Sequence, residues 1–178
     1  MQFDHETLVY MTKVCGALGA GLSMGFGAIG SSYGIGATAQ GALVGIVRQP
    51  KAAGDLTKMM LIGAAVTESP AIFALVTSIL LVFIEPHIPH LTDANYWEVA
   101  GKTIAHCSAL IGAGLCMGWG AFGPGIGDGV ASEGGCIATA RVPEERSSIM
   151  KTMLIGQATA QSTSVYAFVI SLCLIFLT

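Results

Sequence analysis

The sequence carries very little charge. Only 11% of its 178 residues are Asp, Glu, Lys or Arg, whereas 53% are hydrophobic. A soluble domain of this size carries about 25% charged residues. The shortage of charge argues against an ordinary water-soluble globular domain, because most of the molecular surface then has too few charged groups to face water.

Uncharged or nearly uncharged runs cover most of the chain. A helix that crosses a bilayer needs about 20 mostly apolar residues. Four runs reach that length, at residues 14–47, 59–84, 104–140 and 153–178. Only Glu68, Asp128 and Glu133 interrupt them. The pattern predicts an all-α membrane protein with four transmembrane helices.

Two further features are missing. The N-terminus lacks the basic start and short apolar core of a secretory signal, so we expect the first apolar run to stay in the protein. The cysteines form no CxxC pair and lie inside apolar stretches, at positions Cys15, Cys107, Cys116, Cys136 and Cys173. Such positions are typical of small buried residues rather than of metal ligands or disulfides, and we expect no bound cofactor.

The two halves of the chain repeat each other. A shift of 93 residues aligns GAGLSMGFGAIG from Gly19 with GAGLCMGWGAFG from Gly112, and KMMLIG from Lys58 with KTMLIG from Lys151. The repeated unit is a helix, a short polar loop with a proline that breaks the helix, and a second helix. We therefore predict a first transmembrane hairpin at residues 1–84 with a loop near 48–55, a polar linker at 85–102, and a second hairpin at 103–178 with a loop near 141–148.

The charges that remain predict an orientation. Four crossings put both loops on one side of the membrane, and both termini with the linker on the other. The loops and their flanks hold Arg48, Lys51, Lys58, Arg141, Arg146 and Lys151, whereas the opposite side is mostly acidic. By the positive-inside rule we expect the loops in the cytoplasm and the termini on the outer side of a cell (inner) membrane.

Glycine is concentrated in the first helix of each hairpin. Eight glycines recur at the 93-residue shift, namely Gly19, Gly21, Gly25, Gly27, Gly30, Gly34, Gly36 and Gly41. Small residues let helix backbones approach closely in a membrane. Their spacing predicts packing against similar helices on two sides, as in a ring; an ordinary glycine-rich helix pair is the alternative. A phosphate-binding loop is not indicated, because no predicted strand precedes the glycines.

Glu68 is the only charge in the second apolar run. It lies roughly 20 Å past Gly54 at 1.5 Å per residue, near the middle of the membrane. An ionised carboxylate at that depth costs about 2.5–3.5 kcal/mol, so it must be protonated, paired or bound to a cation. The neighbouring runs contain no Lys or Arg that could pair with it. Thr67 and Ser69 could add hydroxyl oxygens, which makes Glu68 a candidate ion-binding residue; a purely structural acid is the alternative.

These features resemble a known family. The glycine pattern, the Arg48-Gln49-Pro50 loop and the stretch MLIGAAVTES ending at Ser69 resemble the c subunit of F-type ATP synthases. The fused layout resembles the proteolipid of V-type ATPases and the duplicated c subunits of some sodium-dependent bacterial synthases. The resemblance covers roughly residues 10–84 and 103–177.

The resemblance implies a non-catalytic rotor subunit. Such c subunits form a ring that turns against a stator a subunit bearing an arginine. Ions carried on the helix-2 glutamate couple ion flow to ATP synthesis or hydrolysis. The implied partners are other c subunits in a ring, the stator a subunit, the central stalk and the bilayer; no nucleic acid is expected. The sequence leaves open whether single-hairpin c subunits share the ring.

The resemblance also implies roles for individual residues. Glu68 would carry Na⁺ or H⁺, and would be the metal ligand if the ion is sodium. The other expected ion-site residues are Ser69, Val66, Ser162, Thr159, Thr163 and Tyr166, while Arg48, Gln49 and Pro50 would contact the stalk. Because family sites form between adjacent hairpins, Glu68 could use Ser162 and the carbonyl group of Thr159 from a neighbouring hairpin.

The chain departs from the family's sodium pattern. The helix-1 glutamine position holds Ile35 in the first hairpin and Asp128 in the second. The helix-2 acid position of the second hairpin holds Gln161, and the tyrosine position of the first holds Phe73. Asp128 and Gln161 are therefore a candidate second site. It would either bind an exchangeable ion or hold a permanently protonated Asp128 that stabilises the ring. The expected hydrogen-bond partners of Asp128 are Gln161, Ser162 and Tyr166.

Two other function classes remain open on the sequence. A small proton-coupled secondary transporter would also place a glutamate in the membrane, but it would need a substrate pocket that so many glycines would leave no room for. A structural pore or assembly protein would not need Glu68.

Overall fold

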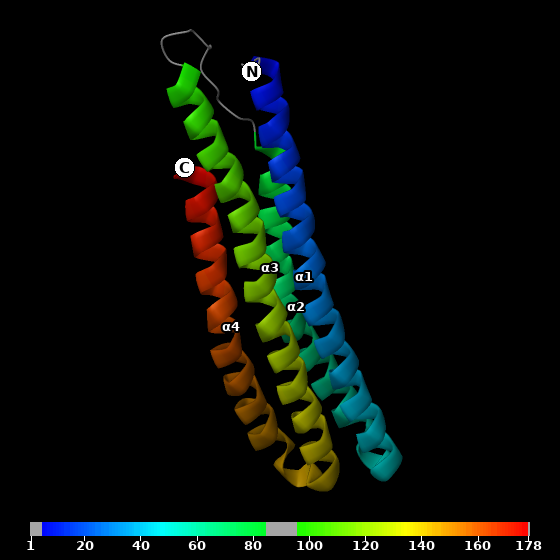
Figure 1. Cartoon of the computed structure of the whole chain (residues 1–178). Coiled ribbons are helices and arrows are strands. Elements are labelled where there is room, and N and C mark those ends of the chain that lie inside the picture. Colours follow the sequence, from blue (N-terminus) through cyan, green and yellow to red (C-terminus); the bar gives the residue numbers. More distant parts are fainter. Residues whose placement is uncertain (1–4, 85–95, 178) are drawn as a thin grey trace.

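The computed structural model describes residues 5–84 and 96–177. Within these ranges the chain forms four α-helices and two 3₁₀ turns: α1 His5–Arg48, η1 Pro50–Ala52, α2 Ala53–Phe83, α3 Tyr96–Arg141, η2 Pro143–Glu145 and α4 Arg146–Phe176 (Figure 1). Each α-helix is long and apolar enough to cross a membrane. The predicted fold class, an all-α membrane protein with four transmembrane helices, is confirmed.

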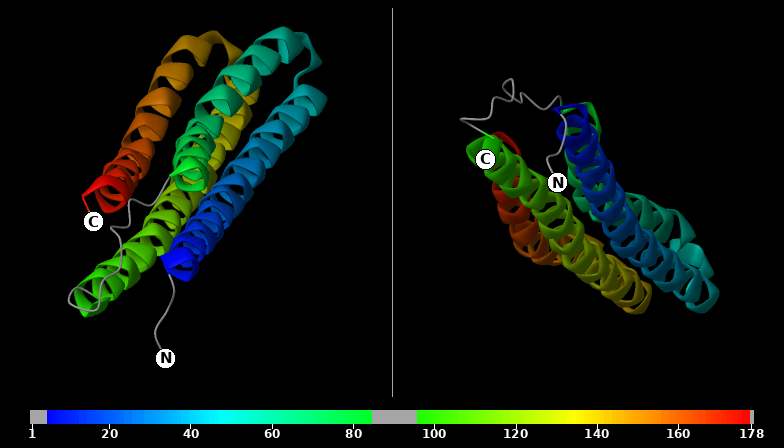
Figure 2. Two further views of the ribbon diagram at one scale, coloured as in Figure 1. Left: turned by 90° about the horizontal axis from the view of Figure 1, so that it is seen from above. Right: turned by 45° about the horizontal axis from the view of Figure 1, so that its top comes forward.

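The helices form two hairpins that lie side by side. The first hairpin is α1 with α2, and the second is α3 with α4. α1 and α3 run in the same direction and share the most extensive interface, while α2 contacts both of them and α4 packs mainly on α3. The two tight turns lie at one end of the bundle, and the first and last helical residues lie toward the other (Figures 1 and 2).

The turns are shorter than the predicted loops. In the first turn only Gln49, with φ −135°, separates α1 from the 3₁₀ turn that begins at Pro50. In the second turn only Val142, with φ −134°, separates α3 from the 3₁₀ turn that begins at Pro143. A proline fits the first position of such a turn because its missing N–H group would have no helical acceptor there. The backbone dihedral angles of the two turns therefore match, as the sequence repeat predicts.

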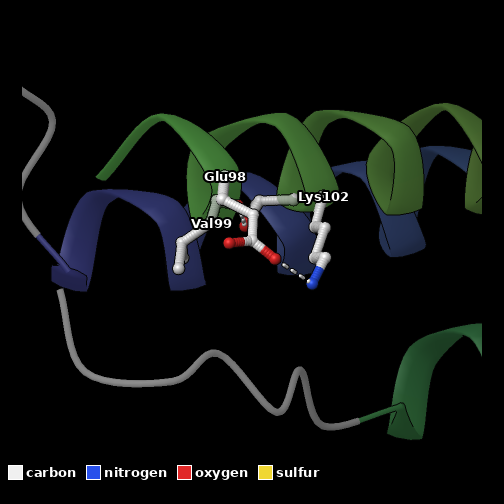
Figure 3. A network of polar contacts seen from close by, with 4 residues as sticks. Glu98, Val99 and Lys102 are labelled. Atoms are coloured by element: carbon white, nitrogen blue, oxygen red, sulfur yellow. Dashed lines mark hydrogen bonds and ion pairs between the residues drawn. The ribbon is translucent and has the colours of Figure 1, made fainter. Parts of the chain in front are cut away.

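The first helix of each hairpin is much longer than the second. α1 and α3 have 44 and 46 residues, whereas α2 and α4 have 31 each. At 1.5 Å per residue the excess is roughly 20 Å. α3 begins at Tyr96, so residues 96–102 of the predicted linker belong to this helix, and residues 85–95 lie outside the described part of the chain. Within its first two turns, Lys102 Nζ lies 2.7 Å from Glu98 Oε1 in an exposed ion pair one helical turn apart (Figure 3).

Glycine backbones form the contact between α1 and α3. A Cβ atom at Gly30 would lie 2.5 Å from the carbonyl oxygen of Phe122, and one at Gly41 would lie 2.8 Å from that of Glu133. On the other side of the contact, a Cβ at Gly125 would lie 2.7 Å from the carbonyl carbon of Gly30. Any side chain at these positions would force the helices apart. The predicted close packing of the glycine-rich helices is therefore present between α1 and α3.

Buried hydroxyl groups repeat as well. Ser78 of α2 donates a hydrogen bond to the carbonyl oxygen of Ala20 at 2.9 Å. Its counterpart, Ser171 of α4, donates to the carbonyl oxygen of Ala113 at the same distance. Each bond ties the second helix of a hairpin to the first, so the two hairpins share the same internal packing.

Candidate functional site

Glu68 lies on the outer surface of α2. Its side chain is exposed, and within residues 5–84 and 96–177 it makes no hydrogen bond or ion pair. Ser69 beside it is half-buried. An ionised carboxylate in a membrane span needs a proton, a cation or a partner. The described part of one chain supplies Glu68 with no partner side chain.

The other expected ion-site residues of α4 face outward too. Thr159 and Thr163 are exposed, and Tyr166 has 66% of its surface exposed. The hydroxyl of Ser162 donates to the carbonyl oxygen of Thr159 at 2.8 Å. No hydrogen bond joins these side chains to Glu68 within the described chain. The structure therefore leaves the acid on α2 and the oxygen-bearing surface of α4 as two separate outward-facing groups.

The acid position of the second hairpin is instead tied to the first hairpin. Gln161 Nε2 donates a 2.6 Å hydrogen bond to the carbonyl oxygen of Val66. In a regular helix that carbonyl would accept from the N–H of residue 70, but residue 70 is Pro70, which has no N–H. Gln161 thus satisfies a carbonyl that the helix leaves free. We did not predict this bond; the signal in the sequence was a proline four residues after Val66.

A second glutamine lies one helical turn away on α4. Gln157 is fully buried, and its Nε2 atom donates to the carbonyl oxygens of Asp128 at 3.1 Å and Gly63 at 3.3 Å. It therefore bridges α4 to both α3 and α2. The matching residue of the first hairpin is Ala64. We did not predict a role for Gln157, although an amide inside an apolar run was a signal for a buried polar contact.

Asp128 is fully buried on α3. The Gln161 side chain interacts with its carboxyl group, but neither carboxyl oxygen has a hydrogen bond of ordinary geometry. Of its other two expected partners, Ser162 is bonded within its own helix and Tyr166 is largely exposed. The structure thus brings together Asp128 and Gln161 from the candidate second site.

The turn residues form an exposed end of the bundle. Arg48 and Pro50 are exposed, and Gln49 is half-buried with its backbone N–H bonded to the carbonyl oxygen of Gly45 at 2.9 Å. An ion pair between Asp55 and Arg146 joins the two hairpins at this end.

Each glycine-rich helix has one packed face and one open face. Gly30 and Gly41 pack against α3, but at their counterparts Gly123 and Gly134 a Cβ atom would meet nothing within 4 Å. Conversely, α3 packs its glycines against α1, and their counterparts on α1 are open. The packed positions are Gly114, Gly118 and Gly129, and the open ones are Gly21, Gly25 and Gly36.

A groove lies beside the open face of α3. It has a volume of about 550 Å³ and runs between α3 and α4 near the second turn, where Gly134, Ala138, Met153 and Gly156 line it. The equivalent groove between α1 and α2 is filled by α3: a Cβ at Gly45 would lie 3.1 Å from Ala140 Cβ. The second hairpin thus presents an empty copy of a surface that is occupied in the first.

Comparison with known sequences shows what this repeated hairpin is. The sequence model that describes the C subunit of ATP synthase matches the chain twice, at residues 18–81 and 111–174. The chain belongs to the ATP synthase C-subunit family. It is a multi-pass membrane protein made of two family repeats, and the resemblance drawn from the sequence is confirmed.

Individual relatives of the family match one hairpin at a time. The ATP synthase c subunit of Alkaliphilus oremlandii is 46% identical over 78 residues, which are 44% of this chain and 88% of the relative. The c subunit of Lachnoclostridium phytofermentans is 51% identical over 70 residues, 39% of this chain and 79% of the relative. That of Dehalococcoides mccartyi is 51% identical over 67 residues, 38% of this chain and 88% of the relative. A nearly complete relative therefore corresponds to less than half of this chain.

The two family repeats in this chain are chemically unequal. The first has Glu68 exposed on α2, and the second has Gln161 bonded to Val66 at the equivalent position of α4. Among the described residues no three His, Cys, Asp or Glu side chains gather in one place.

Proposed function

We propose that the chain is an ion-carrying rotor subunit of a membrane ATP synthase, and that Glu68 carries the ion, Na⁺ or H⁺. The observation that carries the proposal is the Glu68 carboxyl group on the second helix of a family hairpin long enough to span the membrane, which has no partner within the described residues. An acid at this depth is functional by default, because its insertion is costly.

The open glycine faces support assembly into a ring. The open face of α3 is equivalent to the α1 face that packs on α3, and the open face of α1 is equivalent to the α3 face that packs on α1. The α1 helix of one copy therefore fits the α3 helix of the next copy in the way that the two helices fit within one chain. Such a head-to-tail contact uses two different surfaces, and it closes into a ring when the rotation from one copy to the next allows it.

The same geometry indicates how the site at Glu68 is completed. Within the chain, the acid position of the second hairpin reaches the carbonyl group of Val66 on the first. Moved on by one repeat, Glu68 would reach the carbonyl group of Thr159 and the hydroxyl of Ser162 on the second hairpin of a neighbouring copy. This supports a carrier site between two copies of the chain, with Thr163 and Tyr166 on its outer side.

The chain then carries one exchangeable ion for each pair of hairpins. Gln161 cannot ionise, and its N–H already donates to the Val66 carbonyl oxygen that an ion would otherwise bind. At the equivalent position between the two hairpins of one chain, the Gln161 amide therefore takes the place of an ion.

The exposed turns suit the remaining partners. Arg48, Gln49 and Pro50 lie at the end of the bundle that the positive-inside rule assigns to the cytoplasm, where they would contact the central stalk. The outward-facing Glu68 would meet the stator a subunit and its arginine as the ring turns.

Carbodiimide labelling of the purified, assembled protein tests the proposal. The reagent attacks protonated carboxyl groups in apolar surroundings, so we expect the label on Glu68, and we expect Glu68→Gln to abolish it without preventing assembly. Glu133, a half-buried acid on α3, is the matched control and should stay unlabelled. Label found on other acids while Glu68 stays unmodified would contradict the assignment.

Added sodium then identifies the ion. If Glu68 carries Na⁺, sodium at fixed pH should slow the labelling because the cation competes with the proton, and Ser162→Ala should weaken this protection. Labelling that is indifferent to sodium would assign the site to H⁺. Detergent-resistant ring oligomers are expected in both cases and would not be formed by a secondary transporter.

A further inference from the structure

A cluster of buried oxygen atoms without partners lies between α2, α3 and α4. The two carboxyl oxygens of Asp128, the hydroxyl of Ser132 and the side-chain carbonyl oxygen of Gln157 have no hydrogen bond of ordinary geometry in the described chain, although the Gln161 side chain lies beside the Asp128 carboxyl group. All three residues are fully buried, with 0% of their surface exposed. A buried polar group without a partner costs about 1–3 kcal/mol, so this cluster favours a proton or a bound cation.

The three side chains share one place in the bundle. Asp128 and Ser132 are four residues apart on α3 and so lie on the same face. The carbonyl oxygen of Asp128, which lies between them as the helical acceptor of residue 132, also accepts from Gln157 Nε2 at 3.1 Å. The Ser132 hydroxyl lies against Gly63, whose carbonyl oxygen is 3.3 Å from the same Gln157 nitrogen.

The surroundings supply no positive charge. Every orphaned atom is an oxygen, and three of the four can only accept when Asp128 is ionised. Between Lys13 and Arg48, between Lys58 and the end of α2, and beyond Lys151 on α4, there is no lysine or arginine. The other acids at this level are Glu68, exposed on α2, and Glu133, half-buried on α3. A proton on Asp128 would add one donor beside the Ser132 hydroxyl, so a neutral, hydrogen-bonded cluster is the alternative that the Na⁺ measurement below distinguishes.

We propose that Asp128, Ser132 and Gln157 bind a small monovalent cation inside the chain, separate from the carrier site at Glu68. Buried charges in proteins are paired or coordinate metals, and hard cations prefer oxygen ligands. A single positive charge balances the single carboxylate, whereas a divalent ion would leave uncompensated charge in the low dielectric of the membrane.

The bound cation is structural. Gln161 contacts the Asp128 carboxyl group and is itself held on Val66, so it separates the cluster from the outer surface of α2 and α4. The cation therefore joins α2, α3 and α4 without entering the exchange at Glu68. Its existence does not depend on the proposed rotor function.

Binding of ²²Na⁺ to the purified full-length protein tests the site. In Glu68→Gln, which lacks the carrier acid, we expect one Na⁺ per chain to remain, and the added Asp128→Asn substitution should remove it. Glu133→Gln in the same Glu68→Gln background is the matched control, because it removes a neighbouring acid on α3, and it should leave the bound Na⁺ in place. Circular dichroism and native gels confirm that each variant is folded and assembled.

Two outcomes would overturn the site. One is an assembled Glu68→Gln protein that binds no Na⁺, and the other is bound Na⁺ that survives Asp128→Asn. Ser132→Ala, a milder change, should weaken the retained Na⁺ by about tenfold or more; an unchanged affinity would also overturn it. Failure of the carrier proposal is distinguishable, because it would appear as equal labelling of wild type and Glu68→Gln by carbodiimide, whatever their Na⁺ content.

Discussion

The interface between the two hairpins of one chain differs from the one that the open faces offer to a second copy. Within the chain, the polar contacts that join the hairpins include Gln161 with Val66, Gln157 with Gly63, and Arg146 with Asp55. At the equivalent positions between copies the pairs would be Glu68 with Thr159, Ala64 with Gly156, and Ala53 with Ser148. The same backbone geometry thus forms a hydrogen-bonded contact within the chain and would form the proposed ion site between copies.

The largest effect is expected from side chains added to matched glycines of the two interfaces. In Gly30→Val, the new Cβ would lie 2.5 Å from the Phe122 carbonyl oxygen, and such overpacking costs about 1–3 kcal/mol or more. Its counterpart Gly123 faces open space, so Gly123→Val should leave the single chain intact and disrupt assembly.

Two measurements separate the pair. The free energy of unfolding of the single chain in a detergent titration should fall in Gly30→Val and stay near wild type in Gly123→Val. Native gels should show loss of rings in Gly123→Val. Intact rings in that variant would mean that the open face of α3 is not an interface.

Gln161→Glu should convert the interface between the two hairpins of one chain into a second ion site. The carbonyl oxygen of Val66 has no helical donor because of Pro70, so a carboxylate facing it needs a proton or a cation between the two oxygens. We expect a second carbodiimide-reactive residue per chain. Mass spectrometry of labelled peptides checks this, and label confined to Glu68 would show that the two interfaces differ by more than this residue.

The contribution of the Gln161 bond itself is expected to be smaller. Gln161→Leu leaves the partly buried Val66 carbonyl oxygen without a donor and should lower the free energy of unfolding by about 1–3 kcal/mol. Pro70→Ala restores a helical N–H for that carbonyl. In the double variant the cost of Gln161→Leu should therefore shrink, which a double-mutant cycle by detergent unfolding measures; strictly additive effects would contradict the account.

The smallest effect is expected at the turns. Asp55 and Arg146 form a partly exposed ion pair, and such pairs contribute about 0–1 kcal/mol. Asp55→Asn should lower the free energy of unfolding within that range at low salt, with a smaller difference at high salt. A cost well above it would mean that the pair organises the turns rather than only joining them.

Much of the fold followed from the sequence because its signals are local. Uncharged runs predicted the four helices, and the prolines at 50 and 143 predicted the turns. The 93-residue repeat predicted equal hairpins, which Ser78 and Ser171 bear out in their hydrogen bonds. The length of α3 was underestimated, because Glu98 and Lys102 made residues 96–102 look like the end of the polar linker.

The candidate site was less predictable because its contacts join residues far apart in the chain. Glu68 was visible as a lone charge. Gln157 reaches a carbonyl 94 residues away in the sequence, and no local pattern points to such a pair. The free carbonyl of Val66 depended on combining Pro70 with a partner on another helix. The outward direction of Tyr166 required the packing of α4, since its weakly amphipathic sequence does not mark a face.

The covalent joining of the two hairpins determines the order in which first and second hairpins follow one another in an assembly. Because each chain contributes its first and second hairpin in fixed succession, head-to-tail contacts between copies always place the second hairpin of one next to the first of another. Separate hairpins would mix at random, and two of the same kind would often become neighbours. In an assembly made of this chain alone, the single polypeptide instead imposes strict alternation, so successive Glu68 carboxyl groups are two hairpins apart.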